Sequence, residues 1–126
     1  MSKYGNKKIE INGLTFDSKK EGYYYLYLLG RLRNNEIMGL RRQVEYELVP
    51  GVYETRVKHF KTKPDETEQH CIQQPIRYIA DFVYTDCNTG LEEVVDVKSA
   101  ATRKDKVYVL KKKMMRAFKG IEIVEV

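Results

Sequence analysis

The sequence has no long hydrophobic run, little cysteine and little histidine, and each absence excludes a class of protein. No apolar segment approaches the roughly 18 residues that a membrane-spanning helix needs. The first residues, Met1 to Gly5, lack the apolar stretch of a secretory signal. Cys71 and Cys87 allow one disulfide at most, and no Cys/His cluster has the spacing of a zinc site. We therefore expect a protein of the reducing cytoplasm that does not enter a membrane.

The composition indicates one globular domain. The chain has 126 residues and a mass of 14.9 kDa, which is long enough to bury one modest core. Hydrophobic residues make up 42% and charged residues 33% of the chain, a balance typical of folded proteins. No repeat, low-complexity segment or Gly/Ser linker divides it. We therefore expect a single domain spanning residues 1–126.

The balance of charge mildly favours an anionic partner. The formal net charge is +5 and the pI is about 9.1, although many basic proteins bind nothing anionic. The basic residues are not spread evenly but fall in clusters: Lys19-Lys20, Arg31 with Arg33, Arg41-Arg42, Arg56 to Lys63, Arg103 to Lys106, and Lys111 to Lys113. Tyrosines between positions 23 and 27 lie near the first clusters. Their rings can stack on bases or simply fill the core.

The first long element is expected to be a helix, which follows a short strand and turn at Ile9 to Leu14. Ser18 is a candidate N-cap, and Glu21 three residues later completes a capping box. Asn34-Asn35 ends the run. Between these limits, apolar side chains recur at helical spacing, at Tyr24, Tyr25, Leu28, Leu29 and Leu32.

Strands are expected in the middle of the chain. Residues 44–49 alternate apolar and polar side chains and are stopped by Pro50-Gly51. Val52-Tyr53 and Val57 indicate a strand or a ragged extension, whereas residues 61–69 are polar and contain Pro64, so we expect a flexible loop or wing over residues 51–74. Residues 76–84 and 91–98 read as strong strands joined by an Asn/Gly turn, and hence as an antiparallel hairpin. In the first of these, Ile76, Tyr78, Ala80, Phe82 and Tyr84 are expected on one face and the intervening residues on the other.

A second helix and a last strand complete the chain. Between residues 106 and 118, Val107, Leu110 and Met114 recur at helical spacing, and Gly120 is a typical helix stop. Residues 121–126 then read as a strand. The expected order is helix, strand, strand, strand, helix, strand. A strand that follows a crossover helix predicts an α/β fold with a mixed central sheet flanked by helices.

Two acidic residues interrupt the apolar strands of the expected hairpin. Asp81 and Asp96 are each surrounded by hydrophobic neighbours, and a buried carboxylate must be protonated, paired or bound to a cation. Mg²⁺ prefers one or two carboxylates together with waters and phosphate oxygens. Lys98 lies two residues after Asp96, and therefore on the same face of the strand. Its ammonium is suited to stabilise charge on a scissile phosphate or to orient the attacking water.

Each of these residues also has a structural explanation. Asp96 with Lys98, or Asp81 with Arg77, would form an ordinary ion pair on an exposed sheet face. Glu21 needs no catalytic role if it only caps its helix. The presence of Asp81, Asp96 and Lys98 together on two adjoining strands nevertheless favours a metal site.

These residues resemble the motif of the PD-(D/E)XK nuclease superfamily. The pattern is Glu21 on a first helix, Asp81 after an apolar run, and Asp96-Val97-Lys98 on the next strand. Phe16 to Glu21, Tyr78 to Tyr84 and Val95 to Lys98 further resemble a family of small phage proteins associated with Holliday junction resolvases. The resemblance covers residues 8–49 and 75–126. Ala80 stands where the motif's name has proline.

The resemblance implies a restriction-endonuclease-like αβββαβ core and a role for each matching residue. Asp81 and Asp96 would bind Mg²⁺ or Mn²⁺, with the Val97 carbonyl as a further ligand, and Lys98 would be the catalytic lysine. Glu21 would reach the metal directly or through water. Candidate DNA-binding residues are Lys19, Lys20, Arg41, Arg42, Gln43, Lys61, Lys63, Arg103, Lys104, Lys111 and Lys113.

The expected function is metal-dependent hydrolysis of DNA phosphodiesters. The resemblance favours a phage-type Holliday junction resolvase that acts as a homodimer, in the host cytoplasm if a phage encodes it. A nicking or end-processing nuclease on duplex DNA is the first alternative. A non-catalytic DNA-binding module is the second, and an RNA-processing enzyme the third.

Overall fold

A mixed four-stranded sheet forms the centre of the protein in a computed structural model that describes residues 7–126. Its strands are β3 (Ile37–Val49), β6 (Ile76–Asp86), β7 (Glu92–Asp96) and β8 (Ile123–Glu125), in the spatial order β3-β6-β7-β8. β3, β6 and β7 are antiparallel to their neighbours, whereas β8 is parallel to β7. The expected β6–β7 hairpin and the final parallel strand after a helix are therefore confirmed.

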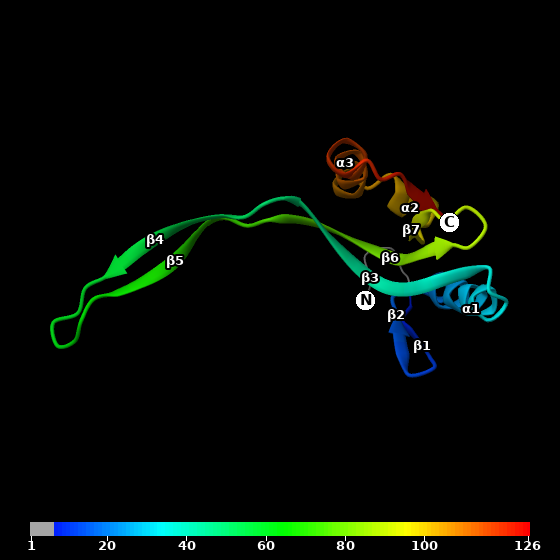
Figure 1. The fold of residues 1–126 in the computed structure, drawn as a ribbon, viewed down its shortest axis with the longest axis horizontal. Helices are drawn as coiled ribbons and strands as arrows, with labels where there is room; N and C mark the ends of the chain where they lie inside the picture. Colours follow the sequence, from blue (N-terminus) through cyan, green and yellow to red (C-terminus); the bar gives the residue numbers. More distant parts are fainter. Residues whose placement is uncertain (1–6) are drawn as a thin grey trace.

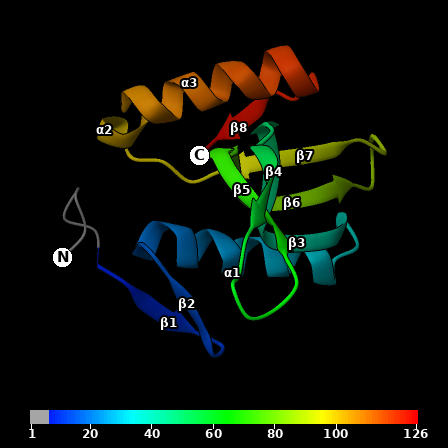
Figure 2. The same ribbon diagram turned by 90° about the vertical axis from the view of Figure 1, so that its left-hand side faces the viewer.

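Helices cover both faces of this sheet (Figure 2). α1 (Lys19–Arg33) lies on one face, and α3 (Lys106–Met114) lies on the other after the short α2 (Ala100–Arg103). α3 continues into a π-helical turn, η1 (Met115–Lys119), which ends at Gly120 in the left-handed conformation (φ 66°) that glycine favours. The fold is thus mixed α/β. No helix in the part of the chain that the structure describes is long and apolar enough to cross a membrane.

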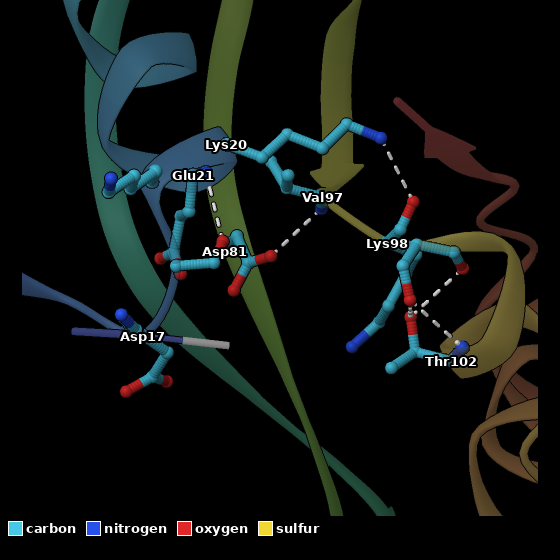
Figure 3. Close-up of a pocket in the computed structure, with 11 residues that line it drawn as sticks. Asp17, Lys20, Glu21, Asp81, Val97, Lys98 and Thr102 are labelled. Carbon is cyan, nitrogen blue, oxygen red and sulfur yellow. Dashed lines mark hydrogen bonds between the residues drawn. The ribbon is translucent and has the colours of Figure 1, made fainter. Parts of the chain in front are cut away.

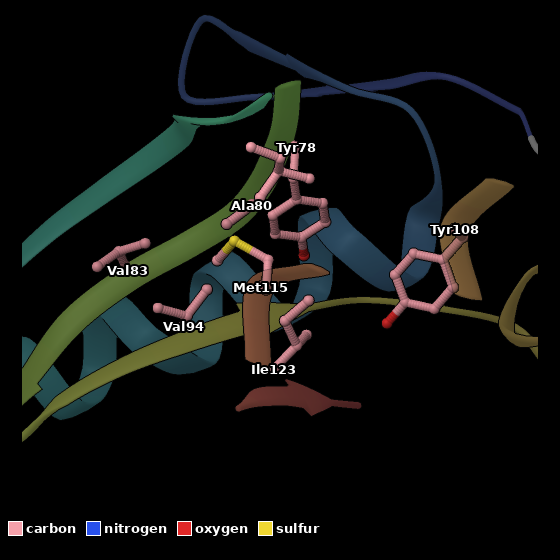
Figure 4. Packing of buried hydrophobic residues seen from close by; sticks show 8 residues of the cluster. Tyr78, Ala80, Val83, Val94, Tyr108, Met115 and Ile123 are labelled. Atoms are coloured by element: carbon pink, nitrogen blue, oxygen red, sulfur yellow. The ribbon is translucent and has the colours of Figure 1, made fainter. Parts of the chain in front are cut away.

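The core consists of two clusters, one on each face of the sheet. Phe82 and Val95 pack with Leu28 of α1, and Val83 and Val94 pack with Met115 on the α3 side (Figure 4). Both faces of β6 are therefore buried, as expected for an interior strand. Strict alternation along β6 was wrong, because Tyr78 and Ala80 belong to the α3-side cluster and Phe82 and Tyr84 to the α1-side cluster.

The change of side coincides with an irregularity in the neighbouring strand. Gln43 adopts a left-handed backbone conformation (φ 51°) between Arg42 and Val44, which pair with Phe82 and Ala80. Left-handed backbone interrupts an extended strand, so side chains on either side of it need not alternate. Asp81 lies at this irregularity.

Residues 51–74 form an ordered arm, which corrects the expected flexible loop and retains the expected wing. β4 (Val52–Lys58) and β5 (Glu66–Gln73) pair as an antiparallel ribbon that projects from β3 and β6 (Figure 1). Pro64 lies in the connection between the strands, where it interrupts no strand pairing. Every residue of β4 is exposed, so the ribbon has no buried face and its sequence lacks the apolar alternation of a core strand.

The N-terminal strand and turn is a small hairpin of β1 (Ile9–Ile11) and β2 (Leu14–Phe16). Asn12 and Gly13 both have positive φ, as a tight two-residue turn requires. The hairpin packs on α1 at Gly22, where an added Cβ would lie 2.7 Å from the Ile9 Cδ1 atom. Gly22 thus permits the close approach that holds the start of α1 beside the sheet.

Element boundaries differ from those expected by a few residues. β3 begins at Ile37 rather than at position 44, because Asn35 (φ 58°) reverses the chain directly after α1. The Ser18 N-cap is confirmed, since its Oγ accepts a hydrogen bond from the Glu21 N–H at 3.1 Å. β7 and β8 are shorter than expected, ending at Asp96 and Glu125.

Candidate active site

A cavity of about 450 Å³ opens where β6 and β7 meet the start of α1. It is lined by residues 17–21, by Asp81 of β6 and by Val97, Lys98 and Ser99 after β7, with Lys7 and Thr102 at its sides (Figure 3). These segments are distant in sequence. The fold therefore gathers Glu21, Asp81, Val97 and Lys98 around one cavity, as the motif predicts.

Asp81 and Asp96 lie opposite each other on neighbouring strands. Phe82 pairs with Val95, so the register continues to Asp81 and Asp96 one residue further. The Asp81 Oδ2 atom accepts a hydrogen bond from the Val97 N–H at 2.8 Å, and its carboxyl lies close enough to Asp96 for the two acids to interact. Asp96 is 1% exposed. The two carboxyl groups thus share a small, poorly solvated space.

One oxygen of Asp96 is held by a neighbour and the other is not. The Tyr78 hydroxyl donates a hydrogen bond to Oδ2 at 2.5 Å. Oδ1 is buried and has no hydrogen-bond partner among the described residues, although Lys98 Nζ lies 3.3 Å away. We interpret this contact as charge attraction without hydrogen-bond geometry. A buried carboxylate oxygen without a hydrogen bond is unfavourable unless a cation approaches it.

Burial and the nearby acids raise the pKa values of Asp81 and Glu21. Burial, followed by the interaction with Asp96 and the charge of Glu21, raises the pKa of Asp81 to about 9. Burial is also the largest cause that raises the pKa of Glu21, followed by the charge of Asp17. The site therefore disfavours a full set of negative charges, as expected where a positive ion would complete the structure.

The donor set fits a divalent cation that also binds water and substrate. Two adjacent carboxylates, one of which has an oxygen without a hydrogen bond (Asp96 Oδ1), match the oxygen ligands that Mg²⁺ or Mn²⁺ accepts. Among the described residues, no three His, Cys, Asp or Glu side chains converge as a ready cation site. The remaining ligands would have to come from water, phosphate oxygens or the Val97 carbonyl.

Glu21 is connected to the acidic pair through Gln43. The Gln43 Nε2 atom donates to Glu21 Oε1 at 3.2 Å and lies 3.5 Å from Asp81 Oδ1. Among the hydrogen bonds of the described residues, the Glu21 carboxylate makes none to the Ser18 amide, so only half of the expected capping box forms. A left-handed glutamine is strained, and such strain is most common at functional sites.

Lys98 is held by contacts that the sequence did not reveal. Its Nζ atom lies 4.8 Å from the centre of the Tyr108 ring, and the Tyr108 hydroxyl donates to Glu125 Oε2 at 2.7 Å. Lys20 Nζ donates to the Lys98 carbonyl oxygen at 3.1 Å. Tyr78 and Tyr108 are therefore site residues that sequence reasoning missed. Each looked like an ordinary core residue, and no local motif distinguishes them.

Of the two structural ion pairs considered for the acids, Asp96 with Lys98 forms, and Asp81 with Arg77 is not seen among the described residues. Arg77 pairs with Glu45 at 3.0 Å. Asp96 and Lys98 do approach each other, but at a buried position and not on an exposed sheet face.

Apart from Gln43, the candidate DNA-binding residues fall into three groups. Lys19 and Lys20 line the cavity beside the acidic pair. Arg41 and Arg42 contact the protein itself: Arg41 pairs with Glu92 at 3.2 Å, and Arg42 donates to the Thr15 carbonyl and lies over the Phe16 ring. The third group lies outside this cavity, with Lys61 and Lys63 in the loop at the end of the arm and Arg103, Lys104, Lys111 and Lys113 on or beside α2 and α3.

Comparison with known proteins gives one match. No curated protein and no solved structure matches the chain. A family model matches residues 1–124, which is nearly the whole sequence. The chain therefore belongs to the family described as "Protein of unknown function (DUF1064)".

Proposed function

We propose that this protein is a metal-dependent endonuclease that hydrolyses phosphodiester bonds in DNA. The observation that carries the proposal is the buried Asp96 Oδ1 atom, which lacks a hydrogen bond and lies beside Lys98, next to the cavity that Asp81 and Lys98 line. A purely structural ion pair gives no reason for two adjacent buried carboxyls, one of which, Asp81, has a raised pKa. A site that binds a cation and a phosphate during catalysis accounts for both the Asp96 oxygen without a hydrogen bond and the raised pKa of Asp81.

The order of the elements supports the finer fold assignment. Without the N-terminal hairpin, the arm and α2, the chain runs α1, β3, β6, β7, α3, β8. This is the αβββαβ order of the restriction-endonuclease-like core that the sequence motif implies. The acids also lie at corresponding places, on the first helix and on the second and third core strands.

The residues of the cavity suggest a division of tasks. Asp81 and Asp96 would hold Mg²⁺ or Mn²⁺, with the Val97 carbonyl as a further oxygen donor and Glu21 reaching the ion through a water. When bound, such an ion polarises the phosphate and lowers the pKa of a water. Lys98, fixed between Asp96 and the Tyr108 ring, is placed to stabilise negative charge on the phosphate. Lys19 and Lys20 supply positive charge beside it.

A substrate panel tests the proposal. The protein would be incubated with Mg²⁺ and labelled duplex, nicked, flapped, single-stranded and four-way DNA, and with matching RNA. We expect metal-dependent cleavage of at least one DNA substrate, and none after Asp96→Asn. Binding without cleavage under any of these conditions would show a non-catalytic DNA-binding module and refute the nuclease. Cleavage of RNA alone would refute the DNA assignment.

Within this activity, a four-way junction cut by a homodimer is the finer proposal. One chain has one acidic centre, whereas resolving a junction requires two cuts on opposing strands. A two-fold dimer would supply two centres related by symmetry. Nicking or end-processing of plain duplex is the competing outcome of the same panel.

A further inference from the structure

A second cavity, of about 230 Å³, lies beside α3 and is lined mainly by cations. Arg103 comes from α2, Val109, Lys112 and Lys113 from α3, and Arg116 from the π-helical turn η1. No acidic side chain lines it. Three consecutive elements therefore contribute basic side chains to the lining of one hollow.

Two of these four cations already have partners, and two remain for a ligand. Lys112 Nζ pairs with Glu125 Oε1 at 2.8 Å, and Arg116 pairs with Glu122 at 3.0 Å. Within the described part of the chain, no carboxylate lies within ion-pair distance of Arg103 or Lys113. The cavity thus has positive charge to match one or two phosphate groups.

Two of these cations, Lys112 and Arg103, help to lower the pKa of the neighbouring Glu125 carboxyl. Burial would raise the pKa of Glu125, but hydrogen bonds from Lys112 and Tyr108 and the charges of Lys112 and Arg103 hold it below its usual value. Arg103 therefore contributes to the same positive region as Lys112. This agrees with their shared cavity.

The second cavity is connected to the candidate active site through α2. Thr102 lines the first cavity, and the next residue, Arg103, lines the second. α2 lies at the end of α3 nearest the start of α1 (Figure 2). A nucleic-acid backbone that leaves the acidic pair across α2 would meet Arg103 first and the α3 cations next.

We infer that the second cavity is a phosphate-binding subsite, which holds the DNA backbone beyond the bond to be cut. This inference rests on the proposed function for the location of the cut, but not for the binding of DNA. Phosphate contacts of this kind position a duplex without reading its sequence. The subsite would therefore set the direction in which the substrate strand crosses the protein.

The test measures DNA affinity against salt in the non-cleaving Asp96→Asn background, with a labelled duplex as the probe. We expect Arg103→Gln with Lys113→Gln to reduce the slope of log affinity against log salt by about 1.8, because each phosphate contact contributes about 0.9. The matched control is Arg56→Gln with Lys58→Gln, which removes the same charge from the arm, where both cations pair with glutamates, and should leave the slope unchanged.

The outcomes separate this inference from the proposed function. An unchanged slope for the Arg103/Lys113 pair, or an equal reduction for both pairs, would overturn the subsite, whatever the wild-type protein cleaves. A selective reduction would support the subsite even if the substrate panel shows no cleavage. Circular dichroism spectra of both double variants that match the parent spectrum would exclude misfolding as the cause of a reduced slope of log affinity against log salt.

Discussion

At the scale of single residues, the fold changes the chemistry of Asp81 through its neighbours on β7 and α1. Its pKa of about 9 lies above the ordinary value of 3.8, so the folded protein binds more protons than the unfolded chain between these limits. The Asp81 carboxyl therefore contributes its full stabilisation of the folded state below about pH 4. This contribution is lost as the pH rises toward 9. This holds for the protein without a bound cation.

Asp81→Asn should stabilise the metal-free protein while abolishing cleavage. An Asn oxygen can still accept from the Val97 N–H, and its NH₂ can donate to Asp96, so the variant imitates the protonated acid. We expect the gain in unfolding free energy to be small near pH 4 and on the order of 2 kcal/mol near pH 8. Chemical denaturation at several pH values in EDTA measures it.

The control for this prediction is Asp65→Asn, which changes an exposed acid near the end of the arm. Its stability should not show the same pH-dependent gain. A gain for Asp81→Asn that does not vary with pH would show that the crowded acids do not control stability. Wild-type turnover by Asp81→Asn in Mg²⁺ would remove Asp81 from the metal site.

Lys98→Ala should lower the cleavage rate far more than DNA affinity. The Lys98 ammonium is fixed between Asp96 Oδ1 and the Tyr108 ring, so it acts from a set position and not as a mobile counter-charge. We expect a loss in single-turnover rate on the order of 10²-fold or more, with a change in Kd of only a few-fold. Lys104→Ala, which removes a nearby charge outside the cavity, is the control. Equal losses in rate and affinity would make Lys98 a simple phosphate anchor.

At the scale of elements, the arm is an ordered ribbon with balanced charge. Residues 51–74 contain four basic and four acidic side chains, so the net charge of +5 belongs to the rest of the protein. Several arm charges pair with each other, as Arg56 does with Glu54 and Lys58 with Glu68. The arm therefore contributes no net charge to the attraction of DNA, in contrast to the cavity beside α3.

Replacing residues 50–75 by Asn-Gly should remove the arm without unfolding the body. The turn would join Val49 and Ile76, which are already paired across β3 and β6. Because every residue of β4 is exposed, the arm buries little apolar surface, and the melting temperature should change by only a few degrees. Thermal melts and the salt dependence of duplex binding measure the result. A collapse of the folded state would show that the ribbon stabilises the body.

At the scale of the whole molecule, α1 presents an apolar stripe to solvent. Tyr23, Leu26 and Tyr27 are 60%, 40% and 57% exposed, at the helical spacing of one face. The neighbouring Tyr24 and Tyr25 pack against the α1-side core cluster instead. The last strand is a weaker candidate for an interface, because β8 has only three residues. The α1 stripe is the better place for a two-fold contact between copies.

Tyr23→Glu with Tyr27→Glu should therefore convert a dimer into a monomer and uncouple the two cuts in a junction. Sedimentation at micromolar concentration would measure the first effect. Paired, symmetric nicks in a supercoiled cruciform would measure the second, and should become single nicks in the variant. Tyr53→Glu, an exposed tyrosine on the arm, is the control. A wild-type protein that stays monomeric on a junction, or cuts linear duplex equally well, would remove the resolvase proposal and leave the nuclease.

The sequence by itself determined the elements whose signals are local. Ser18 marks the start of α1, Gly120 the end of the second helix, and the apolar neighbours of Asp81 and Asp96 single out these acids. These features depend on residues a few positions apart, where helix capping and side-chain periodicity act directly. The position of Lys98 near Asp96 could be predicted for the same reason.

Only the tertiary structure decided how distant residues meet. Glu21 and Gln43 are joined across 22 positions, Tyr78 and Asp96 across 18, and Arg103 shares a cavity with Arg116. The arm pairs two strands without a buried face, and hence without an apolar pattern to reveal them. Such contacts depend on sheet register and helix placement, which no short stretch of sequence encodes. The sequence thus determined which side chains are available for chemistry, and the fold decided which of them act together, because partners chosen by packing need not be neighbours in the chain.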